Sequence, residues 1–206
     1  MSLKILAPVL LLPLFAAAAQ LPELRTEPIG GGTVFFVKNT SSQPLTGYLI
    51  ELVDYPGSSY SLWQDEISSE PVAPGAEKRI QVTNMTAGAV PDYMKIQAAI
   101  YADGSTAGVP EKVTQFIERR KAALATTREL IGRIQKGATK ADLKQWADSL
   151  QPVGKVKSNS QPVINQAAAR TLVSETAAKL EAHSMEETIA SLRASEKALA
   201  SSKPAL

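Results

Sequence analysis

His183 is the only histidine in the chain. Histidine is the side chain most often used as a metal ligand or as an acid and base near neutral pH. A zinc site built from histidine or cysteine needs further ligands of these kinds, and the sequence has no cysteine. A Ser-His-Asp arrangement would have to use His183 as its base, yet no serine stands in a G-x-S-x-G turn. We therefore expect His183 to lie on the surface or at a helix end. We expect that the protein binds no metal and no cofactor and is not an enzyme. The alternative is that it is a cryptic hydrolase.

Two pairs of adjacent carboxylates, Asp65 with Glu66 and Glu186 with Glu187, could share a proton only if both members faced one site. Neighbouring side chains point to opposite faces of a strand and diverge on a helix. The spacing therefore predicts that neither pair acts as an acid and base couple.

Three aromatic residues gather around the Pro56-Gly57 turn, namely Tyr55, Tyr60 and Trp63. Rings at the end of a β domain could stack on sugars or clamp a peptide, because rigid side chains give contact area at low entropic cost. They are our candidates for ligand binding. The alternative is that Trp63 and one tyrosine close the end of the core.

Basic residues are concentrated between residues 111 and 157, where eleven stand against five acidic ones. Residues 20–110 carry ten acidic and five basic residues, so this acidic segment and the basic segment have opposite net charge. The basic segment could bind an anionic envelope polymer or an anionic membrane surface. Alternatively, its helices dock electrostatically on the acidic segment, which is the predicted β domain. The candidate anion-binding residues are Arg119, Arg120, Lys121 and Arg128. We expect no nucleic acid, because no recognised binding motif is present.

The N-terminus has the order of a secretory signal peptide. Lys4 precedes an apolar run over residues 5–15, and small residues follow up to Ala19. The run is too short to cross a bilayer and contains Pro8 and Pro13. The sequence predicts a signal peptide over residues 1–19, no transmembrane segment, and a mature protein that is periplasmic or secreted.

Residues 20–109 read as a small antiparallel β domain, because short apolar runs alternate with clusters of Gly, Pro, Asn and Ser. Residues 21–32 are predicted to be an extended lead-in that ends in a flexible glycine turn. Strands are predicted over residues 33–38, 45–53, 60–67, 77–84, 93–102 and 106–109. In the strand over residues 93–102, Met94, Ile96, Ala98 and Ile100 are predicted to share one face.

After Pro110 the apolar period lengthens to that of a helix. We expect a basic helical region over residues 110–151, with Thr139 capping a second helix, and a linker over residues 152–160. A helical hairpin is expected over residues 161–203, in which Ser184 and Glu187 form a capping box. The apolar stripes of these helices are thin, so they need a partner surface.

Three segments carry a resemblance: V-K-N-T-S-S-Q-P-L-T-G-Y from residue 37, A-P-G-A-E-K-R-I-Q-V from residue 73, and A-I-Y-A-D-G from residue 99. Over about residues 25–109 the chain resembles immunoglobulin-like or fibronectin-III-like modules of exported bacterial proteins. The resemblance implies a β-sandwich that serves adhesion, spacing, chaperoning or recognition. The chain lacks the paired cysteines of antibody-type domains, so Trp63 cannot be taken as their core tryptophan.

The sequence therefore predicts an α+β chain, in which an all-β antiparallel immunoglobulin-like sandwich is followed by a helical C-terminal region. The function expected of it is that of a non-catalytic exported interaction module. Its sandwich would bind a protein partner or the envelope surface, and its C-terminal helices would assemble, including by self-association.

Overall fold

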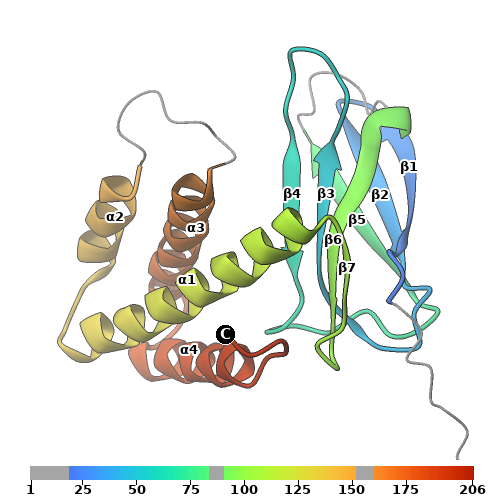
Figure 1. Ribbon diagram of the computed structural model, residues 1–206. Coiled ribbons are helices and arrows are strands. Elements are labelled where there is room, and N and C mark those ends of the chain that lie inside the picture. The colour runs from blue at the N-terminus through green and yellow to red at the C-terminus, as the bar shows by residue number, and fades with distance from the viewer. Residues whose placement is uncertain (1–18, 84–90, 152–159) are drawn as a thin grey trace, which may run out of the picture.

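The computed structural model describes residues 19–83, 91–151 and 160–206, and the predicted signal peptide lies almost wholly outside these residues. An antiparallel β domain comes first and a helical C-terminal region follows, so the chain is an α+β protein (Figure 1). The strands are β1 (Glu23–Ile29), β2 (Gly32–Lys38), β3 (Leu45–Leu52), β4 (Ser61–Asp65), β5 (Glu77–Thr83), β6 (Met94–Tyr101) and β7 (Thr106–Gly108).

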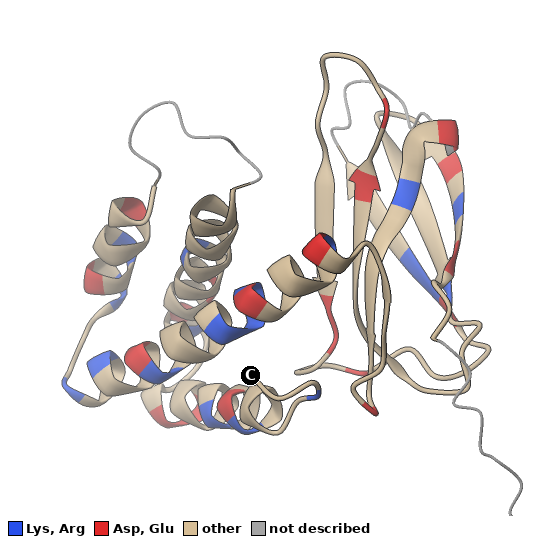
Figure 2. Ribbon diagram, viewed as in Figure 1, with Lys and Arg blue, Asp and Glu red and all other residues tan. Residues whose placement is uncertain are grey.

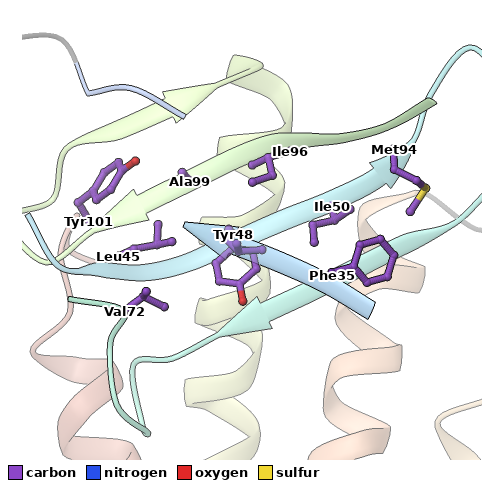
Figure 3. Close-up of a cluster of buried hydrophobic side chains, with 10 residues drawn as sticks. Phe35, Leu45, Tyr48, Ile50, Val72, Met94, Ile96, Ala99 and Tyr101 are labelled. Atoms are coloured by element: carbon purple, nitrogen blue, oxygen red, sulfur yellow. The ribbon is translucent and has the colours of Figure 1, made fainter. Parts of the chain in front are cut away.

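The strands form two sheets that pack against each other. One has the order β1-β2-β5 and the other β4-β3-β6-β7, and all pairs are antiparallel. Between them lies one apolar core that takes side chains from both sheets (Figure 3). Phe35 of β2 and Tyr48 and Ile50 of β3 are fully buried in it. Burying each such side chain contributes roughly 1.5–3 kcal/mol, so this core is the main stabilising feature of the domain.

The lead-in predicted for residues 21–32 contains a strand that the sequence analysis missed. Residues Glu23–Ile29 pair with β2 along its whole length. The strand pattern was hidden by Pro28 and by charged residues at alternate positions, which suit an edge strand with one face in water. Gly31 has φ 76°, which the second central residue of a type II turn requires. The predicted flexible glycine turn is therefore the tight connection between β1 and β2.

The single face predicted for alternate residues of β6 is wrong, because the pairing of β3 with β6 shifts register between Leu49 and Ile50. Met94 and Ile96 pack in the core between the sheets, but Ala98 and Ile100 belong to a cluster on the opposite face. A bulge of this kind reverses the side-chain alternation beyond it. The central part of the sheet thus has apolar residues on both faces.

The helices are α1 (Pro110–Gln135), α2 (Lys140–Ser149), α3 (Gln161–Ala182) and α4 (Met185–Ala200). Helix α1 begins at Pro110, as predicted, because proline fits the first helical position, where no backbone donor is needed. Thr139 caps α2 and Ser184 caps α4, each in a complete capping box, with Asp142 and Glu187 as the returning carboxylates. Within the described residues, no helix is long and apolar enough to cross a membrane.

The four helices pack on one another, and their apolar stripes meet in a second core. Leu130 and Ile134 of α1, Val173 of α3 and Leu192 of α4 are all buried in it. Figure 1 shows α1 running from the β domain into this bundle. The thin stripes therefore find their partner surface within the same chain.

The first half of α1 covers the outer face of the four-stranded sheet. Phe116 is fully buried against Leu49, Ala98 and Ile100. Gly47 of β3 permits this approach, because a Cβ atom there would lie 2.7 Å from Phe116 Cζ and 2.7 Å from Arg120 Nη2. One continuous helix thus contributes to the apolar cluster on the outer face of the sheet and to the core of the bundle, which fixes the bundle relative to the sheets.

Candidate functional site

The three aromatic candidates do not form one platform. Tyr55 packs edge-on against Tyr93, with ring centroids 5.3 Å apart. Tyr60 stacks at 6.4 Å on Phe35 and belongs to the rim of the core between the sheets. Burial raises the pKa of the Tyr60 hydroxyl above its ordinary value. These two tyrosines are therefore parts of the packing around the Pro56-Gly57 turn.

Trp63 lies apart from both tyrosines, on the outer face of β4. Its ring packs against Phe116 of α1, with centroids 5.4 Å apart. It is half-buried, so part of the indole reaches the surface beside α1. The strand alternation produces this placement, because Trp63 pairs with Leu49, whose side chain also faces α1.

Among the basic candidates, Arg120 is fully buried between α1 and the four-stranded sheet. Its Nε lies 3.0 Å from Asp65 Oδ2, and its Nη2 lies 2.8 Å from Asp65 Oδ1. Nη2 also donates to the carbonyl oxygen of Thr46 at 2.9 Å. This guanidinium is a docking group between α1 and the sheet, as the electrostatic alternative expected.

Two further basic candidates are exposed and form ion pairs within the helical region. Lys121 Nζ contacts Glu118 at 2.8 Å on the same helix. Arg128 Nε contacts Glu196 of α4 at 2.9 Å. Figure 2 shows acidic and basic residues interspersed along the helices, not gathered on one uniformly basic face. Such exposed pairs are worth little energetically, but they reduce the positive field that an anionic polymer would meet.

Arg119 differs from its neighbours. Its guanidinium carbon lies 5.9 Å from the centre of the Trp63 ring, within cation-π range. The side chain is half-buried, yet within the described parts of the chain the guanidinium has no hydrogen-bond acceptor or ion-pair partner in contact. Burial lowers the pKa of Arg119, an effect opposed by the charge of Asp65, reinforced by Arg120 and opposed again by Glu175.

We call Trp63, Asp65, Arg119 and Glu175 the junction site, because they come from three elements that meet there. Trp63 and Asp65 belong to β4, Arg119 to α1 and Glu175 to α3. Figure 1 shows α1 running from beside β4 to the helix α3. The structure thus brings together one residue from the aromatic candidates and one from the basic candidates, and it leaves the others elsewhere.

The sequence analysis missed the acidic partners that position α1. Asp65 holds Arg120, and Glu51 of β3 accepts from Lys112 Nζ at 2.8 Å while Ser61 Oγ donates to it at 3.0 Å. The signal was present in the sequence, because Glu51 interrupts an apolar strand. A charge in such a position is buried only when it is paired. Glu175 carried no comparable signal, since it lies on the exposed side of α3.

The two adjacent carboxylates of β4 diverge, as predicted. Glu66 is buried on the side away from α1, where it pairs with Lys78 Nζ and accepts from Ser69 Oγ at 2.6 Å. A surface hollow of about 460 Å³ is lined by Ser69, Lys78 and the loop between them. Because Lys78 and Ser69 already satisfy Glu66, this cluster is explained by packing at the end of the β domain.

His183 is exposed and ends α3, where its backbone N–H donates to Lys179 O at 2.8 Å. The hollow beside it measures about 270 Å³ and is lined also by Lys179, Glu187, Thr188 and Ser191. Within the described residues, no group of three or more histidine, cysteine, aspartate or glutamate side chains is placed to hold a metal ion. His183 thus lies at a helix end, as predicted.

The fold and site together define an α+β protein in which antiparallel sheets are joined to a helical bundle by one shared helix. No protein-family model, curated protein or solved structure matches this chain.

Proposed function

We propose that this chain is an exported, non-catalytic interaction module that binds a protein partner at the junction site. One observation carries the proposal: Trp63 of β4 and Arg119 of α1 are both half-buried and lie within cation-π range of each other, next to the charge of Glu175 on α3. Tryptophan and arginine are the residue types most enriched among the energetically dominant contacts of protein interfaces. Both groups recognise ligands through surface contact and hydrogen bonding, which is why the proposal is binding and not catalysis.

The strand arrangement supports an immunoglobulin-like or fibronectin-III-like domain as the carrier of this site. The orders β1-β2-β5 and β4-β3-β6-β7 divide seven antiparallel strands into sheets of three and four. In the constant-type immunoglobulin arrangement the fourth strand joins the first sheet, whereas here β4 pairs with β3. This displacement matters for function, because it brings Trp63 and Asp65 under α1.

Export is proposed from the signal-peptide pattern, with cleavage after Ala19. The position of Gln20 is in keeping with it, because its carbonyl oxygen accepts a hydrogen bond from the hydroxyl of Tyr101. The first residue of the processed chain would thus be anchored to β6. N-terminal sequencing of the protein from a periplasmic fraction should begin at Gln20, and recovery of the intact N-terminus from the cytosol would contradict export.

Assembly through the C-terminal helices receives less support than binding at the junction site. Phe116, Ile131 and Leu192 are buried within the chain, and Leu172 packs beside them in the bundle. The large apolar residues that are exposed in the described parts are Leu21, Val109 and Met185, which lie on different elements. The helices therefore offer no continuous apolar stripe to a second chain.

A photo-crosslinking residue placed at Glu175 tests protein binding at the junction site. Glu175 is exposed and flanks Arg119, so a bound partner should be captured there as a discrete band in cells. The matched control position is Lys136, which is exposed at the far end of α1. Loss of the Glu175 band on Trp63→Ala would support the proposal. Equal capture from Lys136, or no capture from Glu175, would contradict it.

A further inference from the structure

The N–H donors of the Arg119 guanidinium are available to a ligand, and their geometry indicates which chemical group would bind. A guanidinium carries five N–H donors in a planar fork that fits a carboxylate with two parallel hydrogen bonds. Within the described residues, none of these donors has an acceptor in contact, although the side chain is half-buried. Arg120, the next residue, shows this fork in use, since its Nε and Nη2 engage both oxygens of Asp65.

The contact with Trp63 distinguishes Arg119 from Arg120 as a binding group. The guanidinium carbon of Arg119 lies 5.9 Å from the centre of the Trp63 ring, within cation-π range, and this attraction favours a position of the guanidinium beside the ring. Holding the fork in place in this way reduces the conformational entropy that would be lost when a ligand binds. The exposed part of the indole offers apolar contact next to the donors.

The charges around Arg119 indicate which anion the site accepts. Asp65 and Glu175 act on Arg119 through their charge, and Arg120 stands beside it, so two positive groups face two negative ones. Asp65 is already paired with Arg120, so Glu175 is the carboxylate that a ligand of Arg119 would meet. A polyanion such as a sulfated or phosphorylated polymer would bring several negative charges close to Glu175 and be repelled by it. A single carboxylate next to an apolar side chain would instead place its charge on Arg119 and its apolar neighbour on Trp63.

We infer that the junction site binds a peptide segment of a protein partner in which an acidic side chain is flanked by apolar residues, with Arg119 holding the carboxylate and Trp63 the apolar neighbour. This inference deepens the proposed function and rests on it. It assigns the determinant of recognition to one carboxylate and not to the net charge of the partner.

Titration of Trp63 fluorescence with capped peptides tests the inference. The full chain carries Trp146→Phe, so that Trp63 is the only tryptophan, and circular dichroism checks that each variant is folded. The probe is a capped Gly-Leu-Glu-Leu-Gly peptide, and the control peptide has Gln in place of Glu. We expect the Glu peptide to change the fluorescence and to bind about tenfold more tightly than the Gln peptide.

Variants of the chain separate the carboxylate contact from a general effect of charge. Arg119→Gln should reduce the affinity for the Glu peptide about tenfold, to that of the Gln peptide. Arg119→Lys should fall between the two, because lysine keeps the charge and loses the fork. Arg193→Gln, an exposed change on α4, should leave the affinity unchanged. Glu175→Gln should raise the affinity several-fold, because it removes a competing carboxylate.

The outcomes that overturn the inference are distinct from those that overturn the proposed function. Equal binding of the Glu and Gln peptides, or of the wild-type and Arg119→Gln chains, would show that no carboxylate is recognised. Dextran sulfate or anionic vesicles binding more tightly than the peptide, with loss on Arg119→Gln, would replace the peptide by a polyanion. A crosslink from Glu175 that persists in Arg119→Gln would keep the proposed function while rejecting this determinant.

Discussion

Arg120 and Asp65 form a two-point ion pair beneath α1, with distances of 3.0 Å from Nε to Oδ2 and 2.8 Å from Nη2 to Oδ1. The arginine side chain is completely buried and the aspartate side chain is 16% exposed. Without Arg120, a carboxylate this enclosed would be poorly solvated by water. Each of the two charges is therefore stabilised mainly by the other. The pair joins the helical bundle to the four-stranded sheet.

Replacing Arg120 with methionine should destabilise the protein strongly. Asp65 would keep its charge without a partner, and the Thr46 carbonyl oxygen would lose its 2.9 Å donor. Removing one member of a buried pair typically costs about 3–5 kcal/mol. Chemical denaturation, followed by circular dichroism, measures the free energy of unfolding.

The matched control is Arg128→Met. Arg128 contacts Glu196 at a similar distance, 2.9 Å, but its side chain is 57% exposed, so the change should cost less than about 1 kcal/mol. If the two variants had equal stability, Arg120 would not have the docking role assigned to it.

Gly47→Ala should loosen the contact between α1 and the sheet. The added Cβ atom would lie 2.7 Å from both Phe116 Cζ and Arg120 Nη2, so α1 must move or these side chains must leave their positions. Overpacking of this kind costs about 1–3 kcal/mol. Gly132→Ala makes the same chemical change further along α1, where no atom lies within 4 Å. It should stabilise the helix by about 0.5–1 kcal/mol, and a stabilising Gly47→Ala would contradict the close approach.

The elements that were predicted correctly are those specified by local chemistry. Pro110 begins α1 and Ser184 caps α4 because both depend on backbone donors within one turn. The face of Ala98 and Ile100 could not be read from alternation, because the bulge in β6 is fixed by pairing with β3. Short-range patterns carry no record of such a register shift.

The candidate site was only half predictable for a similar reason. Trp63 and Arg119 were each recognised as candidates, but nothing local indicates that residues 56 positions apart lie within cation-π range of each other. Arg120 could not be distinguished from Arg119 by composition or spacing, since they are adjacent. Their fates differ because a helix turns by about 100° per residue, which directs Arg120 under the sheet and leaves Arg119 at its edge.

The two capping boxes should respond differently to loss of the capping hydroxyl. The Thr139 hydroxyl is the largest cause of the lowered pKa of Asp142, whereas the backbone N–H of Ser184 is the largest cause of the lowered pKa of Glu187. Thr139→Ala should therefore remove the largest cause of the shift and raise the pKa of Asp142 toward its ordinary value. Ser184→Ala should return the pKa of Glu187 only in part. Carboxyl NMR titration measures both.

The same shifts set the direction of the acid response. Because folding lowers both pKa values, their contribution to stability is present above the ordinary values of 3.8 and 4.5 and is lost as the pH falls through the native values. Asp142→Asn and Glu187→Gln should each flatten the decline in stability below about pH 5. A steeper decline in either variant would contradict the sign.

Tyr48 and Tyr101 offer a matched pair in one core, seen together in Figure 3. The Tyr101 hydroxyl donates to the carbonyl oxygen of Gln20, whereas within the described residues the Tyr48 hydroxyl has no hydrogen-bond partner. Tyr101→Phe should therefore cost about 0.5–1.5 kcal/mol, and Tyr48→Phe should cost nothing or stabilise the protein slightly. Denaturation of both variants measures the difference.

The loss of stability at alkaline pH tests the same two hydroxyls, because folding opposes their ionisation. Burial raises the pKa of Tyr101 to about 12, and burial together with the charge of Glu66 raises the pKa of Tyr48 further. Both contributions to stability are complete below the ordinary value of 10.0 and are lost as the pH rises through the native values. Each phenylalanine variant should therefore lose less stability than the wild type above about pH 10. If Tyr48→Phe instead cost as much as Tyr101→Phe at neutral pH, the Tyr48 hydroxyl would have to be satisfied by a buried water.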